Sequence, residues 1–414
     1  MAPLPKILLG VTIDMSIGLM RGFPQYLAEN GWDVHVVSSP GPLLDDLAGV
    51  AGVTAHAVPM RRNPSPFTDL RSLAAWVRLL RRVRPDVLSV GTPKAGLLGG
   101  LAGFLTRVPT RVYLLRGLRL ETTSGLQRRI LIAVERLSVA LSHKVLAVSR
   151  SLRQRAIGLG VVKHDKISVL GLGSSNGVDV AAFNRANFTE EEIAHLSESL
   201  GLIMGVPVIG FVGRLTADKG LHVLAEARTL LTRDGVDHQI LIVGGIDGES
   251  GRVRLDRSRN ASRPAIITGY VSAPAIYYQL MDLLCLPTLR EGFPNVVLEA
   301  GAAGIPTVTT TATGAVDSVV DGETGFTVAT GSAQALADKL AVLVADPQLR
   351  GVMGGKARAW VGESFGTTRV WLLTQQFYAD CSSRGNRANT EAISCFTREF
   401  PRRGLTNRTF TSAK

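Results

Sequence analysis

Residues 290–308, REGFPNVVLEAGAAGIPTV, place one carboxylate before a proline and a second one after it. Pro294 suits the first position of a helix, because its missing N–H needs no partner there. Side chains on a helix lean toward its N-terminus, so Glu299 is expected to point back toward the loop that carries Glu291. Each carboxylate can accept hydrogen bonds from vicinal hydroxyls of a ribose or a hexose. The pair fits the two ends of a nucleotide sugar; alternatively, Glu291 only starts a helix and Glu299 faces water.

The same helix start offers backbone donors to a phosphate. The amides after the proline are free at the positive end of the helix dipole, where phosphates commonly bind. These amides belong to Asn295, Val296 and Val297. We therefore expect a phosphate of the ligand at this end of the helix.

A second motif, VIGFVGRLTADKGLHVL at residues 208–224, places two cations at the end of a β-branched strand. Gly213 and Arg214 follow the strand, and Lys219 starts the next helix. In open α/β sheets ligands bind beyond the carboxyl ends of strands, where this loop and the 290–308 loop should both open. Arg214 and Lys219 can neutralise a diphosphate without a metal ion. Taken singly, each could instead be a solvated surface cation.

Two series of short apolar runs, alternating with helical patterns, must position these motifs. The first extends from KILLGVTI to HKVLAVS, and the second from VPVIGFVGRL to IPTVTT. Such alternation gives parallel, doubly wound sheets, and 414 residues exceed what one hydrophobic core usually holds. We therefore expect an α/β fold of two Rossmann-like domains whose parallel sheets face each other across a cleft.

The domain boundary is expected near residue 200, after a polar linker with a short helix at 171–205. The first domain would then span 1–200 and the second 201–365. A helix over 366–381 is expected to cross back onto the first domain. Residues 382–414 form a basic tail with few apolar residues, for which we expect disorder.

Composition restricts the possible partners. The formal charge of +12 and the pI of about 10.0 indicate an acidic partner, which could be nucleic acid, anionic lipid or a phosphorylated substrate. Nucleic acid is disfavoured, because no aromatic stacking array or recognition motif accompanies the charge. The three scattered cysteines fit a reducing cytoplasm better than a disulfide framework. The longest apolar run, at 95–105, is too short to cross a bilayer.

Residues 69–84 and 125–143 mix arginines with large apolar residues at near-helical spacing. Such amphipathic basic helices can lie in the headgroup layer of an anionic membrane. They can also pack an apolar face on the sheet, and both can hold together. We expect a cytoplasmic protein that lies peripherally on the inner face of the plasma membrane.

Other chemistries lack their motifs. No G-x-G-x-x-G follows a strand, and GVMGGKA at 351–357 lacks the spacing of a phosphate-binding P-loop. No D-x-D occurs, and no histidine or carboxylate cluster has metal-ligand spacing. We therefore expect no cofactor and no metal ion.

The pairing of GRLTADKG with EGFPNVVLEAGAAGIPTV resembles the retaining GT-B glycosyltransferases of family 4, over roughly residues 6–380. The first half is similar to members that build bacterial polysaccharides and lipid-linked oligosaccharides, through VGTPKAGLLGGLAG, VYLLRGLRLETTSG and LGLGSSNGVDVAAFN. The resemblance implies that the first domain presents the acceptor and the second binds the nucleotide sugar, most often a UDP-sugar. It also implies hexosyl or N-acetylhexosaminyl transfer to a lipid-linked or polysaccharide acceptor, with retention at the anomeric carbon.

The resemblance also implies roles for single residues. Arg214 and Lys219 would hold the donor diphosphate, Glu299 the ribose hydroxyls and Glu291 the transferred sugar. The residues expected near the base are Gly269, Tyr270 and Val271.

The first domain departs from the family at one position. Many relatives have a histidine before the glycine after the fifth strand, where this chain has Arg116. Arg116 could donate to the sugar or phosphate, with Arg119 in the same loop, or it could be structural. Lys94 begins a helix that could hold an acceptor phosphate, or it is a solvated lysine. Gly18 could let the backbone approach the donor or acceptor, or it only permits a turn.

Two other functions stay open at this point. A GT-B nucleotide-sugar epimerase would process the donor without any acceptor. A catalytically weak relative that binds glycan or lipid is suggested by Arg116 in place of the histidine, although the cations and carboxylates of the second half argue against it.

Overall fold

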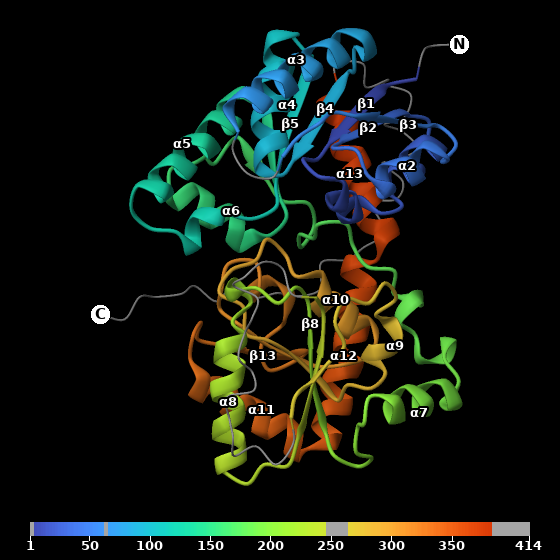
Figure 1. Cartoon of the computed structure of the whole chain (residues 1–414), viewed down its shortest axis with the longest axis vertical. Coiled ribbons are helices and arrows are strands. Elements are labelled where there is room, and N and C mark those ends of the chain that lie inside the picture. Colours follow the sequence, from blue (N-terminus) through green and yellow to red (C-terminus); the bar gives the residue numbers. More distant parts are fainter. Residues whose placement is uncertain (1–3, 62–64, 246–263, 383–414) are drawn as a thin grey trace, which may run out of the picture.

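The computed structural model describes residues 4–61, 65–245 and 264–382, so the predicted tail beyond Ser382 lies outside the described residues. Two α/β domains lie one above the other (Figure 1). Each is built on one parallel sheet, with seven strands in the N-terminal domain and six in the C-terminal domain. The expectation of two Rossmann-like domains with parallel sheets is confirmed.

The N-terminal sheet has the strand order β3-β2-β1-β4-β5-β6-β7. Its strands are β1 (Lys6–Gly10), β2 (Asp33–Ser38), β3 (Val53–Ala57), β4 (Val87–Gly91), β5 (Thr110–Leu115), β6 (Lys144–Ala147) and β7 (Ile167–Ser168). Its helices are α1 (Phe23–Glu29), α2 (Pro42–Ala48), α3 (Pro66–Val83), α4 (Pro93–Leu105), α5 (Gly125–Leu141) and α6 (Arg150–Gly158). The central strand β4 is buried throughout, as expected of a parallel strand covered on both faces.

The C-terminal sheet has the order β10-β9-β8-β11-β12-β13. Its strands are β8 (Val208–Val212), β9 (Gln239–Val243), β10 (Ile266–Ile267), β11 (Leu283–Leu286), β12 (Thr307–Thr310) and β13 (Gly325–Val328). The helices in this half are α7 (Glu190–Ser199), α8 (Leu221–Arg233), α9 (Ala275–Tyr278), α10 (Asn295–Ala302), α11 (Ala333–Ala345) and α12 (Pro347–Phe365). In both sheets the strand order reverses once, between β1 and β4 and between β8 and β11, and ligands of such sheets bind at these reversal points.

The chain passes from β7, the last strand of the first sheet, to β8 of the second through residues 169–207, a connection that includes the predicted boundary near residue 200. Within this connection the ring edge of Phe183 meets Tyr278 with ring centroids 5.4 Å apart. This aromatic contact attaches part of the connection to the second domain.

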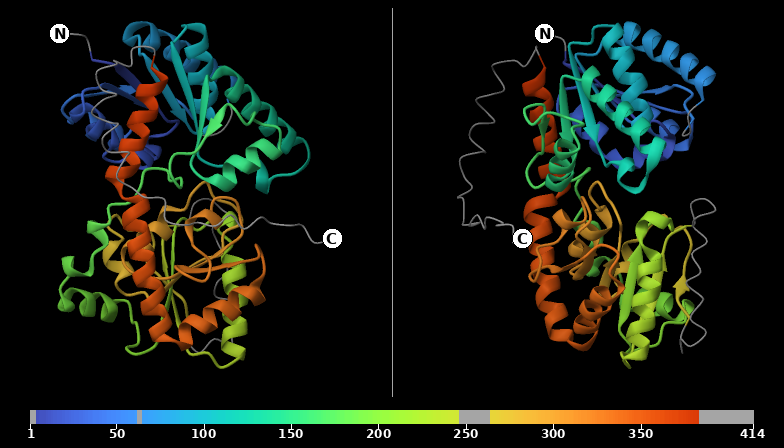
Figure 2. Two further views of the ribbon diagram at one scale, coloured as in Figure 1. Left: turned by 180° about the vertical axis from the view of Figure 1, so that it is seen from behind. Right: turned by 90° about the vertical axis from the view of Figure 1, so that its left-hand side faces the viewer.

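The chain returns to the first domain through α13 (Thr367–Cys381), which Figure 2 shows continuing from α12 along both domains. The hydroxyls of Tyr378 and Ser89 lie 2.8 Å apart, and Thr110 Oγ1 donates to the carbonyl of Cys381 at 2.7 Å. The Val178 amide donates to the Phe365 carbonyl at 2.9 Å, beside the return crossing. The two crossings therefore lie side by side.

Further contacts join the domains on the cleft side. Arg290 Nε donates to Thr122 Oγ1 at 2.9 Å, and Thr313 Oγ1 donates to a Glu121 carboxylate oxygen at 2.7 Å. The Ser151 amide donates to Asp317 at 2.9 Å. These contacts bring the carboxyl ends of the two sheets together. In the described part of the chain no helix is both long and apolar enough to cross a bilayer.

Candidate active site

The loops after β8 and β11 meet at the reversal point of the C-terminal sheet. The Lys219 ammonium pairs with the Glu291 carboxylate, and these side chains are only 16% and 12% exposed. The sequence analysis assigned the two residues to different parts of one ligand. Their direct contact places both at one point of the cleft.

Tight backbone packing fixes this meeting of loops. Gly220 has φ +70°, and a Cβ there would lie 1.8 Å from the Pro287 carbonyl oxygen, so a side chain does not fit. The Leu289 amide donates to the Asp218 carbonyl at 2.8 Å. The Arg290 guanidinium lies 3.0 Å from the Asp218 carboxylate. These contacts on both sides of Lys219 fix its loop against the loop after β11.

Glu299 lies on α10 and points to a tyrosine rather than to open water. Tyr278 Oη donates to Glu299 Oε2 at 2.7 Å. Burial raises the pKa of Glu299, while this hydrogen bond and the positive charge of Arg21 act to lower it. Arg21 comes from the N-terminal domain, so Glu299 lies within electrostatic reach of both domains.

The start of α10 differs from the prediction by one residue. The helix begins at Asn295, with Pro294 as its N-cap. The Val297 amide donates to the Pro294 carbonyl at 3.1 Å, so the expectation that Val297 offers a free donor is wrong. The first turn closes on the proline carbonyl, so of the three predicted amides those of Asn295 and Val296 remain as candidates.

Residues 269–271, which were expected near a base, lie beside the loop that carries Arg214. The Gly244 amide donates to the Gly269 carbonyl at 3.0 Å, and the Leu215 amide donates to the Gly245 carbonyl at 2.9 Å. Tyr270 is 81% exposed, whereas the following Val271 is exposed only in part. Gly213 has φ +145° at the end of β8, a conformation that favours glycine.

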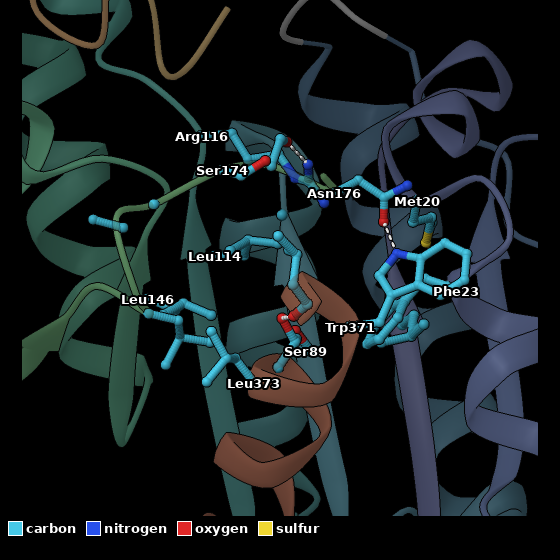
Figure 3. A pocket seen from close by; sticks show the side chains of 18 of the residues that line it. Met20, Phe23, Ser89, Leu114, Arg116, Leu146, Ser174, Asn176, Trp371 and Leu373 are labelled. Carbon is cyan, nitrogen blue, oxygen red and sulfur yellow. Dashed lines mark hydrogen bonds between the residues drawn. The ribbon is translucent and has the colours of Figure 1, made fainter. Parts of the chain in front are cut away.

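Arg116 projects from the end of β5 into the N-terminal domain. Its Nη1 donates to Ser175 Oγ and to the Leu19 carbonyl at 3.3 Å, whereas its buried Nε has no hydrogen-bond partner. Burial lowers the pKa of Arg116 to about 10, so the side chain stays charged at neutral pH. Figure 3 shows Arg116 at one end of a cavity of about 50 Å³ between the sheet and α13, with Leu114 and Leu146 along it.

The backbone next to Arg116 touches the loop that carries Glu291. A Cβ on Gly292 would lie 1.9 Å from the Arg116 carbonyl oxygen. Gly117, at φ +143°, lies on the other side of this contact. Only a glycine at 292 allows the two domains to come this close, and the contact places the backbone of Arg116, rather than its side chain, beside the loop that carries Glu291.

The remaining predicted residues lie in the N-terminal domain. Lys94 pairs with Asp69 at 2.7 Å, which favours a structural role over an acceptor phosphate site. Arg119 is exposed in the loop after β5. Gly18 is exposed, and a Cβ there would meet nothing within 4 Å, so no steric need for glycine exists at this position.

Sequence reasoning missed Tyr278, Arg21, Ser175 and Gly292. Tyr278 and Arg21 stand in no recognisable motif, so only the fold brings them to Glu299. Gly292 stands inside the EGFP stretch, between a carboxylate and a helix start. A glycine in that place could have been recognised as a sign of close backbone packing. The described residues contain no group of three or more histidine, cysteine or acidic side chains arranged to hold a metal ion.

Comparison with known proteins agrees with this geometry. A model described as Glycosyl transferase 4-like domain matches residues 21–173, and one described as Glycosyl transferases group 1 matches residues 193–360. The chain is similar to the capsular polysaccharide biosynthesis glycosyltransferase CapM of Staphylococcus aureus, with 37% identity over 374 residues, 90% of this chain and 96% of the relative. The chain belongs to the group 1 glycosyltransferases.

More distant relatives extend the comparison. The UDP-Gal:alpha-D-GlcNAc-diphosphoundecaprenol alpha-1,3-galactosyltransferase of Escherichia coli is 25% identical over 368 residues, which are 86% of this chain and 91% of the relative. The crystal structure of HepE from Anabaena, in complex with UDP and glucose, superposes with a TM-score of 0.72, at 20% identity over 92% of this chain and 100% of HepE. The likeness to HepE shows the GT-B fold of this glycosyltransferase.

Proposed function

We propose that this glycosyltransferase moves a hexosyl or N-acetylhexosaminyl group from a UDP-sugar to a lipid-linked or polysaccharide acceptor, with retention at the anomeric carbon. The product belongs to a cell-surface glycan such as a capsule or exopolysaccharide. The observation that carries the proposal is the largely buried Lys219–Glu291 pair at the reversal point of the second sheet, on a loop whose Gly292 packs against the backbone of Arg116 in the first domain. The names of the Staphylococcus aureus and Escherichia coli relatives support this class of product and acceptor.

In this proposal each part of the donor, from the base to the sugar, has a residue to bind it. Tyr270 offers an exposed ring to the uracil, and Glu299 accepts from the ribose hydroxyls while Tyr278 holds its other oxygen. Arg214, Lys219 and the amides of Asn295 and Val296 surround the diphosphate. Glu291 accepts from hydroxyls of the transferred sugar, next to the phosphate that leaves.

The chemical step separates charge, and the site stabilises the charge that develops on the leaving group. As the glycosidic bond lengthens, positive charge grows on the sugar and negative charge on the departing UDP. Lys219 and Arg214 stabilise the second charge in a partly dehydrated cleft, with no divalent ion required. Charge-assisted hydrogen bonds contribute roughly 1.5 to 3 kcal/mol each, so loss of one cation slows transfer roughly ten- to hundredfold.

The acceptor approaches from the N-terminal domain, where Arg116 stands in place of the expected histidine. Arg116 keeps its charge, and its buried Nε has no partner, so it can donate to an acceptor or sugar oxygen after a small movement. The basic helices α3 and α5 place the enzyme on an anionic membrane surface, at the cytoplasmic side where nucleotide sugars are present.

Product analysis tests the proposed function. Purified enzyme would be incubated with a panel of UDP-hexoses and UDP-N-acetylhexosamines, with and without a polyprenyl-diphosphate-linked saccharide. We expect UDP release that depends on the acceptor, and an α-linked product from an α-linked donor by NMR. Interconversion of the donor sugar without acceptor would indicate an epimerase. Binding without UDP release across the acceptor panel would indicate a non-catalytic relative.

A further inference from the structure

A second hollow lies on the N-terminal domain at the edge opposite the cleft. Its volume is about 450 Å³, and it opens where β5, β6 and β7 begin. We call it the basic hollow, after its four cationic side chains Arg111, Lys144, Lys163 and Lys166. Because the carboxyl ends of these parallel strands form the cleft, the basic hollow is separated from the donor and acceptor sites by the length of the sheet.

The charge in the basic hollow is not balanced by the protein. Asp165 is the single carboxylate among the residues that line it, against four cations. Burial lowers the pKa of Lys166 and the neighbouring charge of Arg111 lowers it further, while Asp165 acts in the opposite direction without reversing the shift. His143, also in the lining, has its pKa lowered by burial and by the charges of Arg111 and Lys166. The described residues give none of the three lysines an ion pair, so the positive charges of the cluster repel one another.

Stability of the fold accounts for only one of these cations. Arg111 donates through Nε to the Leu141 carbonyl at 2.7 Å and through Nη1 to the Val108 carbonyl at 2.8 Å. These bonds tie the end of α5 to the sheet. Lys144 and Lys163 are exposed, and their ammonium groups make no comparable bond within the described part of the chain.

An exposed apolar stripe leads along α5 to the basic hollow. Leu126, Ile130 and Leu137 are 73%, 54% and 47% exposed, although the opposite face of α5 packs on the domain. Their spacing puts them on one helix face, which continues to the exposed Ala140 in the lining of the hollow. At the other rim Phe104 is 55% exposed. Figure 1 places α5 at the outer flank of the upper domain.

We propose that the basic hollow binds the headgroup of an anionic membrane lipid that carries two phosphates, while the α5 stripe lies in the headgroup layer. Four cations around one hollow match paired phosphates better than a single one. The apolar rim favours a lipid over soluble phosphate, because exposed leucine and isoleucine gain only from an apolar surface. This inference rests on the proposed function, in which the enzyme acts at an anionic membrane surface, but it concerns a site distant from the cleft.

Vesicle sedimentation with the full-length enzyme tests the site. Vesicles of phosphatidylcholine would contain cardiolipin or phosphatidylglycerol at matched surface charge. We expect tighter binding to cardiolipin, and a loss of roughly thirtyfold in the partition coefficient on cardiolipin for Lys163→Ala/Lys166→Ala. The matched control Lys339→Ala/Lys356→Ala removes the same charge from the C-terminal domain and should bind like the wild type. Leu126→Ser/Ile130→Ser should weaken binding to both vesicles alike.

Three results would overturn the inference. One is unchanged cardiolipin binding by the lysine variant, and another is an equal loss on both vesicles, which would mean unspecific attraction. The third is a thermal shift with inorganic phosphate that the lysine variant abolishes while its vesicle binding persists, which would assign the hollow to a soluble phosphate. UDP release by the variants checks that they fold. It also separates failure of this site from failure of the proposed function.

Discussion

Two lysine–carboxylate pairs of nearly equal burial lie in the two domains, and they differ in what surrounds them. Lys94 and Asp69 are 11% and 23% exposed and join the first turns of α4 and α3. Lys219 and Glu291 are 16% and 12% exposed and join two strand ends at a reversal point. The first pair joins the starts of two helices, whereas the second joins the loops after β8 and β11, which we propose to bind the donor. Burial and pairing alone therefore do not distinguish the lysine that we propose to be catalytic from one that only joins two helices.

The largest effect on kcat should come from moving the loop that carries Glu291 away from the first domain. Gly292→Ala forces a methyl group onto the Arg116 carbonyl, 1.9 Å from the ideal Cβ position, so the domains must separate. We expect kcat to fall by more than about a hundredfold, because the acceptor side no longer meets the donor.

Gly355→Ala serves as the control for this change, since a Cβ there meets nothing within 4 Å. Its kcat and melting temperature should stay near those of the wild type. A Gly292→Ala enzyme with full kcat would show that the close approach is not needed for transfer.

Replacing the lysine of each pair compares the two pairs directly. Lys219→Ala should lower kcat roughly a hundredfold, because it removes a diphosphate cation and leaves Glu291 without its partner. Lys94→Ala should leave kcat within about threefold and cost about 1 kcal/mol of unfolding free energy. Steady-state kinetics with urea unfolding separate the two outcomes, and equal loss of kcat in both variants would contradict the contrast.

A smaller effect is expected at Glu299. Tyr278→Phe removes the hydrogen bond that lowers the pKa of Glu299, so burial raises that pKa further. The carboxylate needed for the ribose then persists only at higher pH, and the acid limb of kcat/KM should move upward. At neutral pH we expect roughly a tenfold loss of donor affinity. An acid limb that stays in place would mean that Tyr278 acts only in packing.

Much of the fold was predictable, because buried parallel strands correspond to short apolar runs in the sequence that alternate with helical patterns. The Lys219 and Glu291 loops were also predictable, since both follow strands that must end at one edge. The partners Tyr278 and Arg21 were not, because only the packing of α9 and of the loop after β1 brings them to Glu299. The free donor expected at Val297 was wrong, because the first turn of α10 closes with a bond from the Val297 amide to the carbonyl three residues back, at Pro294.

The pairing of Lys94 with Asp69 was equally hidden. The two residues stand on separate helices, and nothing in their spacing indicates that the first turns of α3 and α4 lie side by side. Pairs within one motif can be read from a sequence, whereas pairs between motifs depend on the arrangement of the helices.

Calorimetric titration of UDP tests the central claim most directly, with wild type and Lys219→Ala, each in the presence and absence of a chelator. We expect the wild type to bind UDP equally well with the chelator, and Lys219→Ala to bind at least about tenfold more weakly in both conditions. Binding that vanishes with the chelator, or that is unchanged in Lys219→Ala, would contradict a diphosphate held by fixed cations.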